Sequence, residues 1–317
     1  MQTALIVGAG GQDGRLLAQF LGRRGYQMTG WVRREPSGQL PCPWTVMDLL
    51  EINSVERELQ TLRPQEIYYL AAYHHSTEES VDEDSSEHLR QSFEVHVGGL
   101  LNVLQAIKRH SPDTKLFYAA SSHVFGDCAQ DWADETTPFR PNSAYGISKL
   151  AGIRCCDLIR TQDRIFASTG ILFHHDSPWR KASFVSQRIV RGALQARRDP
   201  GIKIAIGNLD VRIDWGYAPD YVDAMSRIVQ LNEPGDFVVS SGELHSVREF
   251  VEAAFEEVGL DWREHVQIEQ RLLKRVSQPL KGNSAKLRSR TGWSPTVRFR
   301  ELVGKLVWET EKLNAIT

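Results

Sequence analysis

The sequence contains few cysteines and no long apolar segment. Its four cysteines stand at no spacing typical of a metal site or a disulfide framework, and the adjacent Cys155 and Cys156 are interpreted as packing residues of a helix rather than a redox pair. No apolar run approaches the roughly 20 residues that a membrane helix needs. The first residues also lack the basic, apolar and cleavage-site segments of a signal peptide. We therefore expect a cytoplasmic protein with no metal ion and no membrane partner.

An excess of charge of one sign is also missing. The chain has 317 residues, with 38 Lys and Arg against 40 Asp and Glu, so its formal net charge is −2. A nearly neutral chain gives no reason to expect nucleic acid as a partner, although a local group of arginines could still bind an anionic ligand. The length is sufficient for a large core and two lobes.

What the sequence does contain is a regular alternation of β-rich runs and helical patterns, which is typical of βαβ units and a parallel sheet. The predicted strands are Ala4–Val7, Gln27–Val32, Glu66–Ala71, Lys115–Ala120 and Ile165–Phe173. The predicted helices between them are Arg15–Arg24, Val55–Leu62, Ser92–Arg109 and Ala144–Arg160. The fold class is therefore α/β, a Rossmann doubly wound parallel sheet with a smaller α/β C-terminal substrate lobe.

The alternation becomes less regular after residue 173. We expect a loop over His174–Arg180, further helices over Phe184–Arg197, Asp220–Gln230 and Val247–Val258, and strands over Ile202–Ile206 and Phe237–Ser240. The predicted cofactor domain is 1–173, with 214–242 returning to its sheet. The predicted substrate lobe is 174–213 and 243–317.

A glycine-rich turn follows the first predicted strand and opens the first helix. Gly8, Gly11 and Gly14 would allow a tight turn, a close approach of backbone to a pyrophosphate, and close packing of the helix, with Gln12 and Asp13 in the same turn. A purely structural turn is the alternative. The position of this motif favours a dinucleotide-binding site.

The second predicted strand ends in Arg33 and Arg34, where selection of NAD would call for an acidic residue. Two guanidinium groups favour a ribose 2′-phosphate, and hence NADP, over a solvated surface pair. Asp48 follows the third apolar run, where its carboxylate either accepts from the adenine amine or caps a turn.

Tyr145 and Lys149 stand four residues apart on one predicted helix, and Ser121 ends the strand before it. A lysine ammonium can lower the pKa of a phenol, so that Tyr145 exchanges a proton with a hydroxyl while a hydride moves. The serine hydroxyl can orient the reacting oxygen. Along the chain come first the glycine turn, then the strand-end serine, and then the Tyr/Lys pair. This is the order that coupled proton and hydride transfer needs.

These motifs resemble those of the extended short-chain dehydrogenases, and most closely those of the GDP-mannose 4,6-dehydratase family. The similar segments run along nearly the whole chain and include 11–14, 32–34, 70–72, 135–139, 145–149, 170–178, 207–210 and 212–222. The resemblance implies a GDP-sugar substrate. It places Leu49, Leu70, Ala71, Ala72, Tyr145 and Lys149 near the cofactor, and Ser122, His174, His175, Arg188, Asn208 and Arg212 near the substrate. Of these, Arg188 could instead be a surface cation, and Asn208 could be a turn residue.

The chain departs from that family at the strand end. The dehydratases carry Thr-Ser-Glu there, and the Glu removes the C5 proton and helps water to leave from C6, whereas this chain reads Ser121-Ser122-His123. A neutral imidazole can act as a general base near neutrality, so His123 either replaces the Glu or lines the pocket. A further departure is Tyr73-His74-His75-Ser76. The stretch from Arg34 to Asp48 is shorter than the loop that the resembling family uses in tetramer contacts, which favours a homodimer, with a tetramer as the alternative.

Three functions remain open at this point. The first is a dehydratase that oxidises C4, eliminates water and reduces C6, with His123 as the acid/base. The second is a GDP-4-keto-6-deoxysugar 4-reductase or epimerase, which needs Ser121, Tyr145 and Lys149 but no Glu. The third, of another class, is a non-catalytic NADP-binding sensor.

Overall fold

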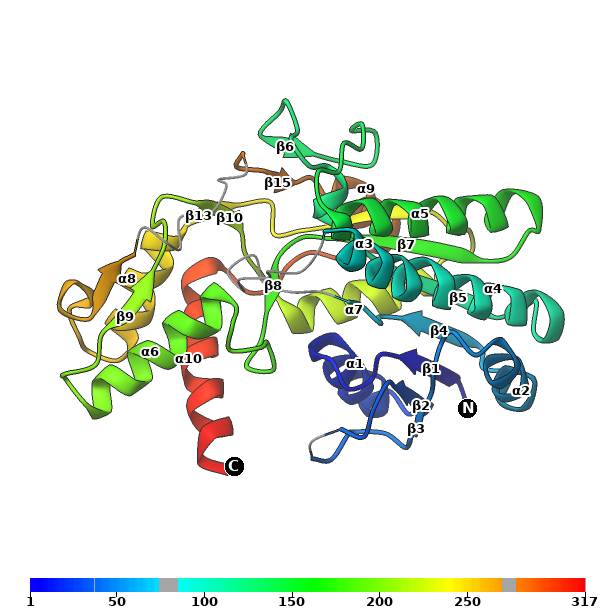
Figure 1. The fold of residues 1–317 in the computed structure, drawn as a ribbon, viewed down its shortest axis with the longest axis horizontal. Helices are drawn as coiled ribbons and strands as arrows, with labels where there is room; N and C mark the ends of the chain where they lie inside the picture. The colour runs from blue at the N-terminus through cyan, green and yellow to red at the C-terminus, as the bar shows by residue number, and fades with distance from the viewer. Residues whose placement is uncertain (37, 74–84, 270–277, 317) are drawn as a thin grey trace.

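The computed structural model describes residues 1–36, 38–73, 85–269 and 278–316. A large parallel sheet with helices on both faces forms one part of the molecule, and a smaller lobe built around three helices lies beside it (Figure 1). Within the described residues, no helix combines the length and apolarity needed to cross a membrane.

The large sheet has seven strands, all parallel. Across the sheet they are β12 (Asp236–Val239), β7 (Ala167–Leu172), β5 (Lys115–Ser121), β4 (Glu66–Tyr69), β1 (Thr3–Val7), β2 (Gln27–Val32) and β3 (Trp44–Val46). The chain winds outward in one direction from β1 to β3 and in the other from β4 to β12. The change of direction between β1 and β4 is the switch point where open α/β sheets bind ligands. The predicted doubly wound sheet is confirmed.

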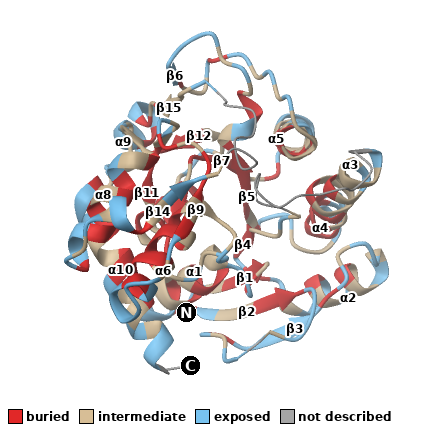
Figure 2. Cartoon of the chain, turned by 60° about the vertical axis from the view of Figure 1, so that its left-hand side comes forward, coloured by how far each residue is buried: buried red, intermediate tan, exposed pale blue. Residues whose placement is uncertain are grey.

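Helices cover both faces of this sheet with apolar side chains, so its central strands β1, β4, β5 and β7 are largely buried, whereas the edge strand β3 is exposed (Figure 2). On one face lie α2 (Ile52–Leu62), α4 (Gly99–His110) and α5 (Ala144–Gln162). On the other lie α1 (Gln12–Arg23), α7 (Ala218–Val229) and α9 (Ala285–Thr291). Parallel strands buried on both faces read as continuous apolar runs, which is why the sequence revealed them.

The predicted helix over Ser92–Arg109 is helical throughout, but it begins earlier and is not a uniform α-helix. The structure has α3 (Ser85–Phe93), one π-helical turn η1 (Glu94–Gly98), and then α4. The Tyr69 hydroxyl donates to the Val95 carbonyl at 2.5 Å, which satisfies that group from outside the helix. A Cβ on Gly99 would stand 2.6 Å from the same hydroxyl, so glycine lets the helix pass this close. π turns often occur at functional sites.

The smaller lobe has its own apolar core, formed between α6 (Val185–Arg198), α8 (Val247–Glu257) and α10 (Phe299–Ile316). Two strand pairs complete it: β9 (Ile204–Ile206) with β14 (Val266–Ile268), and β10 (Arg212–Asp214) with β13 (Leu244–Ser246). The short 3-10 helix η3 (Trp262–Glu264) follows α8. No element was predicted after Val258, so α9 and α10 are additions from the structure.

Short strand pairs connect the two parts. The predicted loop over His174–Arg180 contains β8 (His175–Asp176), which pairs with β11 (Gly216–Tyr217), so that expectation needs correction. A second pair joins β6 (Trp132–Ala133) to β15 (Lys281–Gly282). As predicted, α7 and β12 bring the chain back to the large sheet, where β12 pairs with β7.

Candidate functional site

The turn between β1 and α1 contains Gly8, Gly11 and Gly14 and presents backbone without side chains; we call it the glycine cradle. Gly8 has φ +95°, and a Cβ there would stand 2.8 Å from the Ala71 nitrogen. A Cβ on Gly14 would stand 2.4 Å from the Gly8 carbonyl oxygen. Gly11 caps α1, and its N–H donates to the Gly8 carbonyl at 3.1 Å. Side chains are excluded at these positions, and the helix presents its free N–H groups here, an arrangement suited to a phosphate.

The segments after β3 and β4 border this cradle. The Leu70 N–H donates to the Val7 carbonyl at 2.8 Å, which brings Leu70, Ala71 and Ala72 beside the glycine turn. The Asp48 carboxylate is exposed and accepts from the Leu50 N–H at 3.0 Å, as a turn-capping residue does. Asp48 and Leu49 follow β3, the edge strand next to β2. The bond to Leu50 shows Asp48 in the turn-capping role, and its contact with adenine stays a prediction.

Arg33 and Arg34 come directly after β2, and both are exposed. Among the described residues, neither guanidinium has a hydrogen-bond or ion-pair partner. Two exposed cations therefore stand at the end of the strand next to the glycine turn. That position is where the ribose of a dinucleotide lies in folds of this class.

Gln12 and Asp13 contact the segment that enters the smaller lobe. Gln12 accepts from the Ser177 N–H at 3.1 Å and from its hydroxyl at 3.0 Å. His175 donates from Nε2 to both Asp13 carboxylate oxygens at 3.1 Å and from Nδ1 to the Phe173 carbonyl at 2.7 Å. These bonds join the first turn of α1 to β8.

Both ring nitrogens of His175 face acceptors, which favours the protonated imidazole. Burial opposes that charge, but the Asp13 carboxylate outweighs it and raises the pKa of His175. Burial in turn works against the Asp13 carboxylate, but His175 more than compensates and lowers the pKa of Asp13. The ring also stacks on Tyr221, with centroids 4.4 Å apart. The result is a buried ion pair between the two parts of the molecule.

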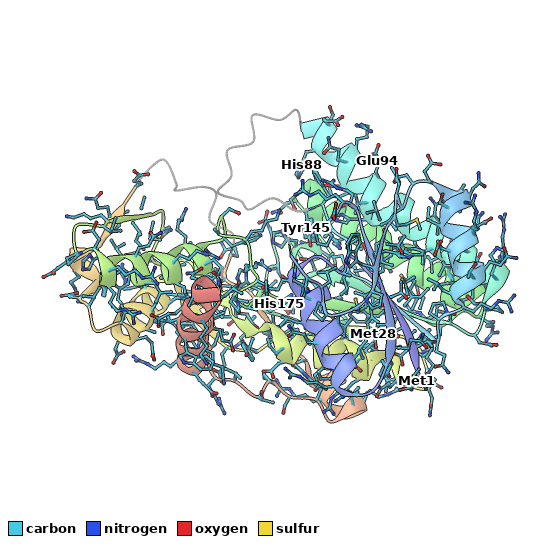
Figure 3. All side chains as sticks on the ribbon, turned by 90° about the horizontal axis from the view of Figure 1, so that it is seen from below. Met1, Met28, His88, Glu94, Tyr145 and His175 are labelled. Carbon is cyan, nitrogen blue, oxygen red and sulfur yellow. The ribbon has the colours of Figure 1, made fainter. Side chains whose placement is uncertain are left out.

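Tyr145 and Lys149 lie on the first turns of α5, beside the end of β5. Ser143 caps this helix by accepting from the Gly146 N–H at 3.1 Å. The buried Lys149 ammonium donates to the Ala119 carbonyl at 2.7 Å and lies 5.6 Å from the centre of the Tyr145 ring. Figure 3 labels Tyr145 and His175 near the junction of the two parts of the molecule.

Burial governs the titration of these two residues. It raises the pKa of Tyr145 to about 12, although Arg180 and a hydrogen bond from Ser121 act in the opposite direction. It lowers the pKa of Lys149 to about 7, against the attraction of Asp13. The phenol is therefore hydrogen-bonded to the strand-end serine, with the lysine behind it, which is an arrangement suited to moving a proton.

His123 and His174 follow the ends of β5 and β7. His123 lies in the 3-10 turn η2 (Ser122–Val124), is exposed, and packs edge-on to Tyr145 with centroids 5.5 Å apart. Neighbouring protein atoms keep water from the imidazole, which lowers the pKa of His123, and the charges of His174 and Arg180 act in the same direction. The preceding Ser122 is half-buried.

The remaining candidates lie on the smaller lobe. Arg188 is half-buried on α6, and Arg212 is exposed on β10, where it donates to the Leu244 carbonyl at 3.1 Å. The Asn208 side chain accepts from the Asp210 N–H at 2.8 Å, so it does stabilise a turn. These three residues thus belong to the smaller lobe, whereas Ser121, Tyr145 and Lys149 lie on β5 and α5.

A chain of hydrogen bonds that sequence motifs did not predict lies behind Tyr145. The Tyr73 N–H donates to His96 Nε2 at 3.0 Å, so Nδ1 carries the proton and donates to the Ser148 hydroxyl at 2.8 Å. Ser148 then donates to the Tyr145 carbonyl at 3.0 Å, and the buried His96 ring packs edge-on to Tyr145. The only local signal was a histidine just before the Gly98-Gly99 pair. His74, His75 and Ser76 lie outside the described residues.

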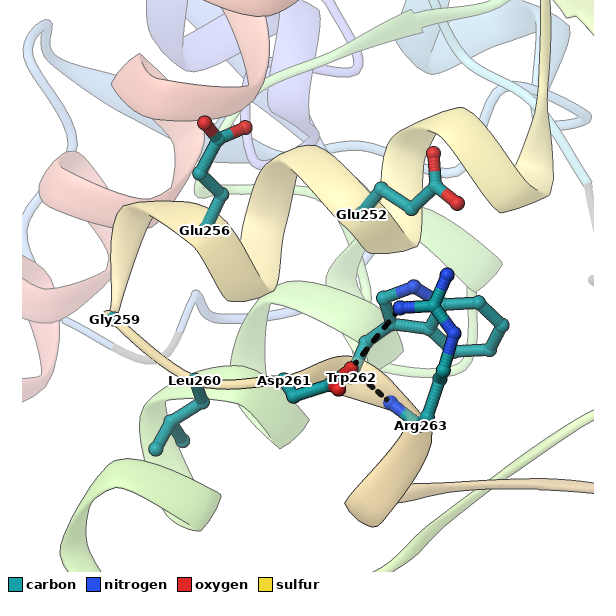
Figure 4. Close-up of a pocket in the computed structure, with 7 residues that line it drawn as sticks. All are labelled: Glu252, Glu256, Gly259, Leu260, Asp261, Trp262 and Arg263. Carbon is teal, nitrogen blue, oxygen red and sulfur yellow. Dashed lines mark hydrogen bonds and ion pairs between the residues drawn. The ribbon is translucent and has the colours of Figure 1, made fainter.

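A surface pocket elsewhere is lined by residues of α8 and η3 and shares no residue with this cluster (Figure 4). In the part of the chain that the structure describes, no three His, Cys, Asp or Glu side chains gather so as to hold a metal ion. Neither feature adds to the candidate site.

A glycine turn at the switch point of a doubly wound sheet, with Ser121, Tyr145 and Lys149 beside it, defines an extended short-chain dehydrogenase fold and site. Within that class, the profile of the family described as GDP-mannose 4,6 dehydratase matches residues 5–306, and the chain belongs to this family. GDP-mannose 4,6 dehydratase 1 of Arabidopsis thaliana is 34% identical over 333 residues, covering 98% of this chain and 90% of that protein.

Solved structures agree on the fold. A dTDP-glucose 4,6-dehydratase of Bacillus anthracis in complex with NAD superposes with a TM-score of 0.85 at 16% identity, covering 98% of this chain and 97% of that one. The protein RMD of Pseudomonas aeruginosa, complexed with NADPH, has a TM-score of 0.81 at 21% identity, covering 98% and 100%. The resemblance inferred from sequence motifs is confirmed.

Proposed function

We propose that this chain is an NADP-dependent GDP-mannose 4,6-dehydratase in which His123 replaces the catalytic Glu. The observation that carries the proposal is the Ser121, Tyr145 and Lys149 cluster beside the glycine cradle, in a chain that matches this family along nearly its whole length. The substrate would be a GDP-sugar, as the names of the curated relatives indicate.

The cradle fits a dinucleotide because Gly8 and Gly14 let the turn pack directly on the backbone of Ala71 and Ala9, which leaves the free N–H groups at the start of α1 for a pyrophosphate. The residues that would hold the cofactor are Gly8, Gly11, Gln12, Asp13, Gly14, Asp48, Leu49, Leu70, Ala71, Ala72, Tyr145 and Lys149. Structural neighbours carry either NAD or NADPH, so the choice depends on the cations at the end of β2. Arg33 and Arg34 favour NADP by offering charge-assisted bonds to a 2′-phosphate.

A bound nicotinamide cofactor would supply the hydride acceptor for oxidation at C4 and the hydride donor for reduction at C6. Tyr145 accepts the proton of the C4 hydroxyl, and Ser121 holds that oxygen in place. The Lys149 ammonium lies 5.6 Å from the Tyr145 ring centre, where it favours the phenolate. His123 removes the C5 proton, which is acidic once C4 is a ketone.

The smaller lobe would hold the GDP portion. Arg212 and Arg188 suit a diphosphate, and Asn208 suits a base or ribose edge. Ser122, His174 and His175 would border the sugar. We retain the division into a cofactor domain, 1–173 with 214–242, and a substrate lobe, 174–213 and 243–317, as part of this proposal.

The experiment is to incubate the purified protein with GDP-mannose and catalytic NADP and to follow the sugar nucleotide by mass spectrometry. We expect the loss of one water without net NADPH formation. The variant His123→Glu, which restores the family's carboxylate, should retain or increase this activity, and His123→Gln should lose it. An unchanged sugar mass, with NADP shown to be bound, would contradict the proposal.

The second candidate function is a 4-keto-6-deoxysugar reductase or epimerase, and the observation that favours it is the histidine at position 123. It predicts NADPH-dependent reduction of the GDP-4-keto-6-deoxysugar by a protein that leaves GDP-mannose unchanged. A non-catalytic NADP-binding sensor would turn over neither. For the assembly we propose a homodimer in the cytoplasm, with a tetramer as the alternative, and light scattering on the purified chain tests the subunit number.

A further inference from the structure

Two neighbouring strands bring a pair of histidines to the same edge of the sheet. In the β5–β7 ladder Ser121 lies opposite Leu172, so the parallel strands end level with each other. His123 and His174 each follow two residues beyond that level. The carboxyl ends of parallel strands are where ligands bind in open α/β sheets. His174 also acts electrostatically on His123 and contributes to lowering its pKa.

His174 is held by a buried carboxylate. Its Nε2 donates to an Asp176 oxygen at 2.7 Å, and the ring packs edge-on to the buried Trp215, with centroids 4.8 Å apart. The other Asp176 oxygen accepts from the Ser186 hydroxyl at 2.9 Å and faces Arg180 at 3.6 Å. Among the described residues none hydrogen-bonds Nδ1 of His174, and 22% of the side chain is exposed. The ring is therefore held in place through Nε2, and Nδ1 is available to bond a ligand.

The carboxylate partner is ionised. Burial works against its charge, but His174, Arg180 and Ser186 together lower the pKa of Asp176 to about 2. This ionised carboxylate holds His174 through its Nε2–H at 2.7 Å. At His123, removal from water lowers the pKa, and His174 and Arg180 act in the same direction, so the neutral imidazole is favoured there. One imidazole fixed on an ionised carboxylate, beside a second one kept neutral, is an arrangement suited to separate acid and base roles.

We propose that His174, held by Asp176, is the acid that protonates the C6 hydroxyl as it leaves, while His123 is the base that takes the C5 proton. This inference rests on the proposed dehydratase function. One carboxyl group serves both ends of the elimination in the resembling family, whereas here two imidazoles would divide the work. Asp176 is then a positioning residue, and His174 a catalytic one.

The protons and electrons balance. Tyr145 takes the C4 hydroxyl proton and His123 takes the C5 proton. The C5–H electron pair becomes the C5–C6 double bond, the C6–O bond breaks, and the departing oxygen takes the His174 proton and leaves as water. His123 returns its proton to C5 when C6 is reduced. The proton gained by Tyr145 replaces, through solvent, the one that His174 lost.

The test separates the two histidines by following two events in D₂O with GDP-mannose and NADP. One is deuterium entry at C5 of recovered GDP-mannose, which needs reversible oxidation at C4 and the base but not the acid. The other is the loss of water, which needs the acid as well. We expect His174→Gln to lose water about 100-fold more slowly than the wild type while it exchanges C5 within a few-fold of the wild-type rate. His123→Gln should lose both events.

His110→Gln, at the end of α4, is the matched histidine control and should retain both events. Retained C5 exchange reports an intact site, and if His174→Gln fails to bind NADP, His174→Asn takes its place. Water loss in the His174 variants within about threefold of wild type would overturn the inference. So would the joint loss of both events in a variant that binds NADP. A wild-type protein that leaves GDP-mannose intact would instead overturn the proposed function.

Discussion

The buried ion pair of Asp13 and His175 should be a large contributor to stability, and Asp13→Asn measures it. The exposed fractions of the two side chains are 21% for Asp13 and 8% for His175, so most of their charge is removed from water. Breaking a buried pair by removing one partner costs about 3–5 kcal/mol. Because Asp13 retains some exposure, we expect a loss near the lower limit, about 3 kcal/mol at pH 6.

The pKa shifts of the two residues determine whether the stability loss is larger at low or at high pH. The pKa of His175 is raised from 6.5, so its contribution is complete below pH 6.5 and is lost as the pH rises through the raised value. The pKa of Asp13 is lowered from 3.8, so its contribution is present above that pH and is lost only in more acidic solution. The stability difference between wild type and Asp13→Asn should therefore be larger at pH 6 than at pH 9.

Urea unfolding at both pH values measures this difference. Asp13 also attracts the Lys149 ammonium, and this attraction is lost as Lys149 deprotonates through its lowered pKa of about 7, so it changes the stability difference in the same direction. The matched control is Asp163→Asn, which breaks the exposed ion pair with Lys108 and should cost less than about 1 kcal/mol. An Asp13→Asn loss below 1 kcal/mol at pH 6, or an equal loss at the two pH values, would refute the reasoning.

Three further outcomes are expected. Tyr145→Phe should lower kcat about 100-fold or more, because the proton acceptor is lost, while isothermal titration still detects NADP binding; a near-normal kcat would exclude Tyr145 from the proton transfer. Gly14→Val should abolish NADP binding in the same titration, since a Cβ there meets the Gly8 carbonyl at 2.4 Å; unchanged affinity would count against the cradle. His96→Phe should lower the free energy of unfolding in urea by about 1–3 kcal/mol, because it removes the hydrogen-bond partner of Ser148 and of the Tyr73 N–H. Equal stability would mean that this chain of hydrogen bonds does not stabilise the fold.

The local patterns of the sequence were sufficient for the large sheet, the glycine turn and the helix that carries Tyr145 and Lys149. Each depends on neighbours within a few residues: apolar runs for strands such as β4, small residues for the turn, and a spacing of four for one helix face. The return of β12 to the sheet was also predictable, because a helix followed by an apolar run resembles the units before it.

Contacts between distant segments were decided by the tertiary structure alone. The π turn depends on the Tyr69 hydroxyl, which is 26 residues away from Val95 in sequence, and the bonds of Asp13 to His175 span 162 residues. The fixing of His174 by Asp176 depends on Trp215 and Arg180 packing around it. A sequence motif records which side chains are present. It does not record which nitrogen of a histidine faces a carboxylate, because that depends on how strands and helices from separate parts of the chain pack together.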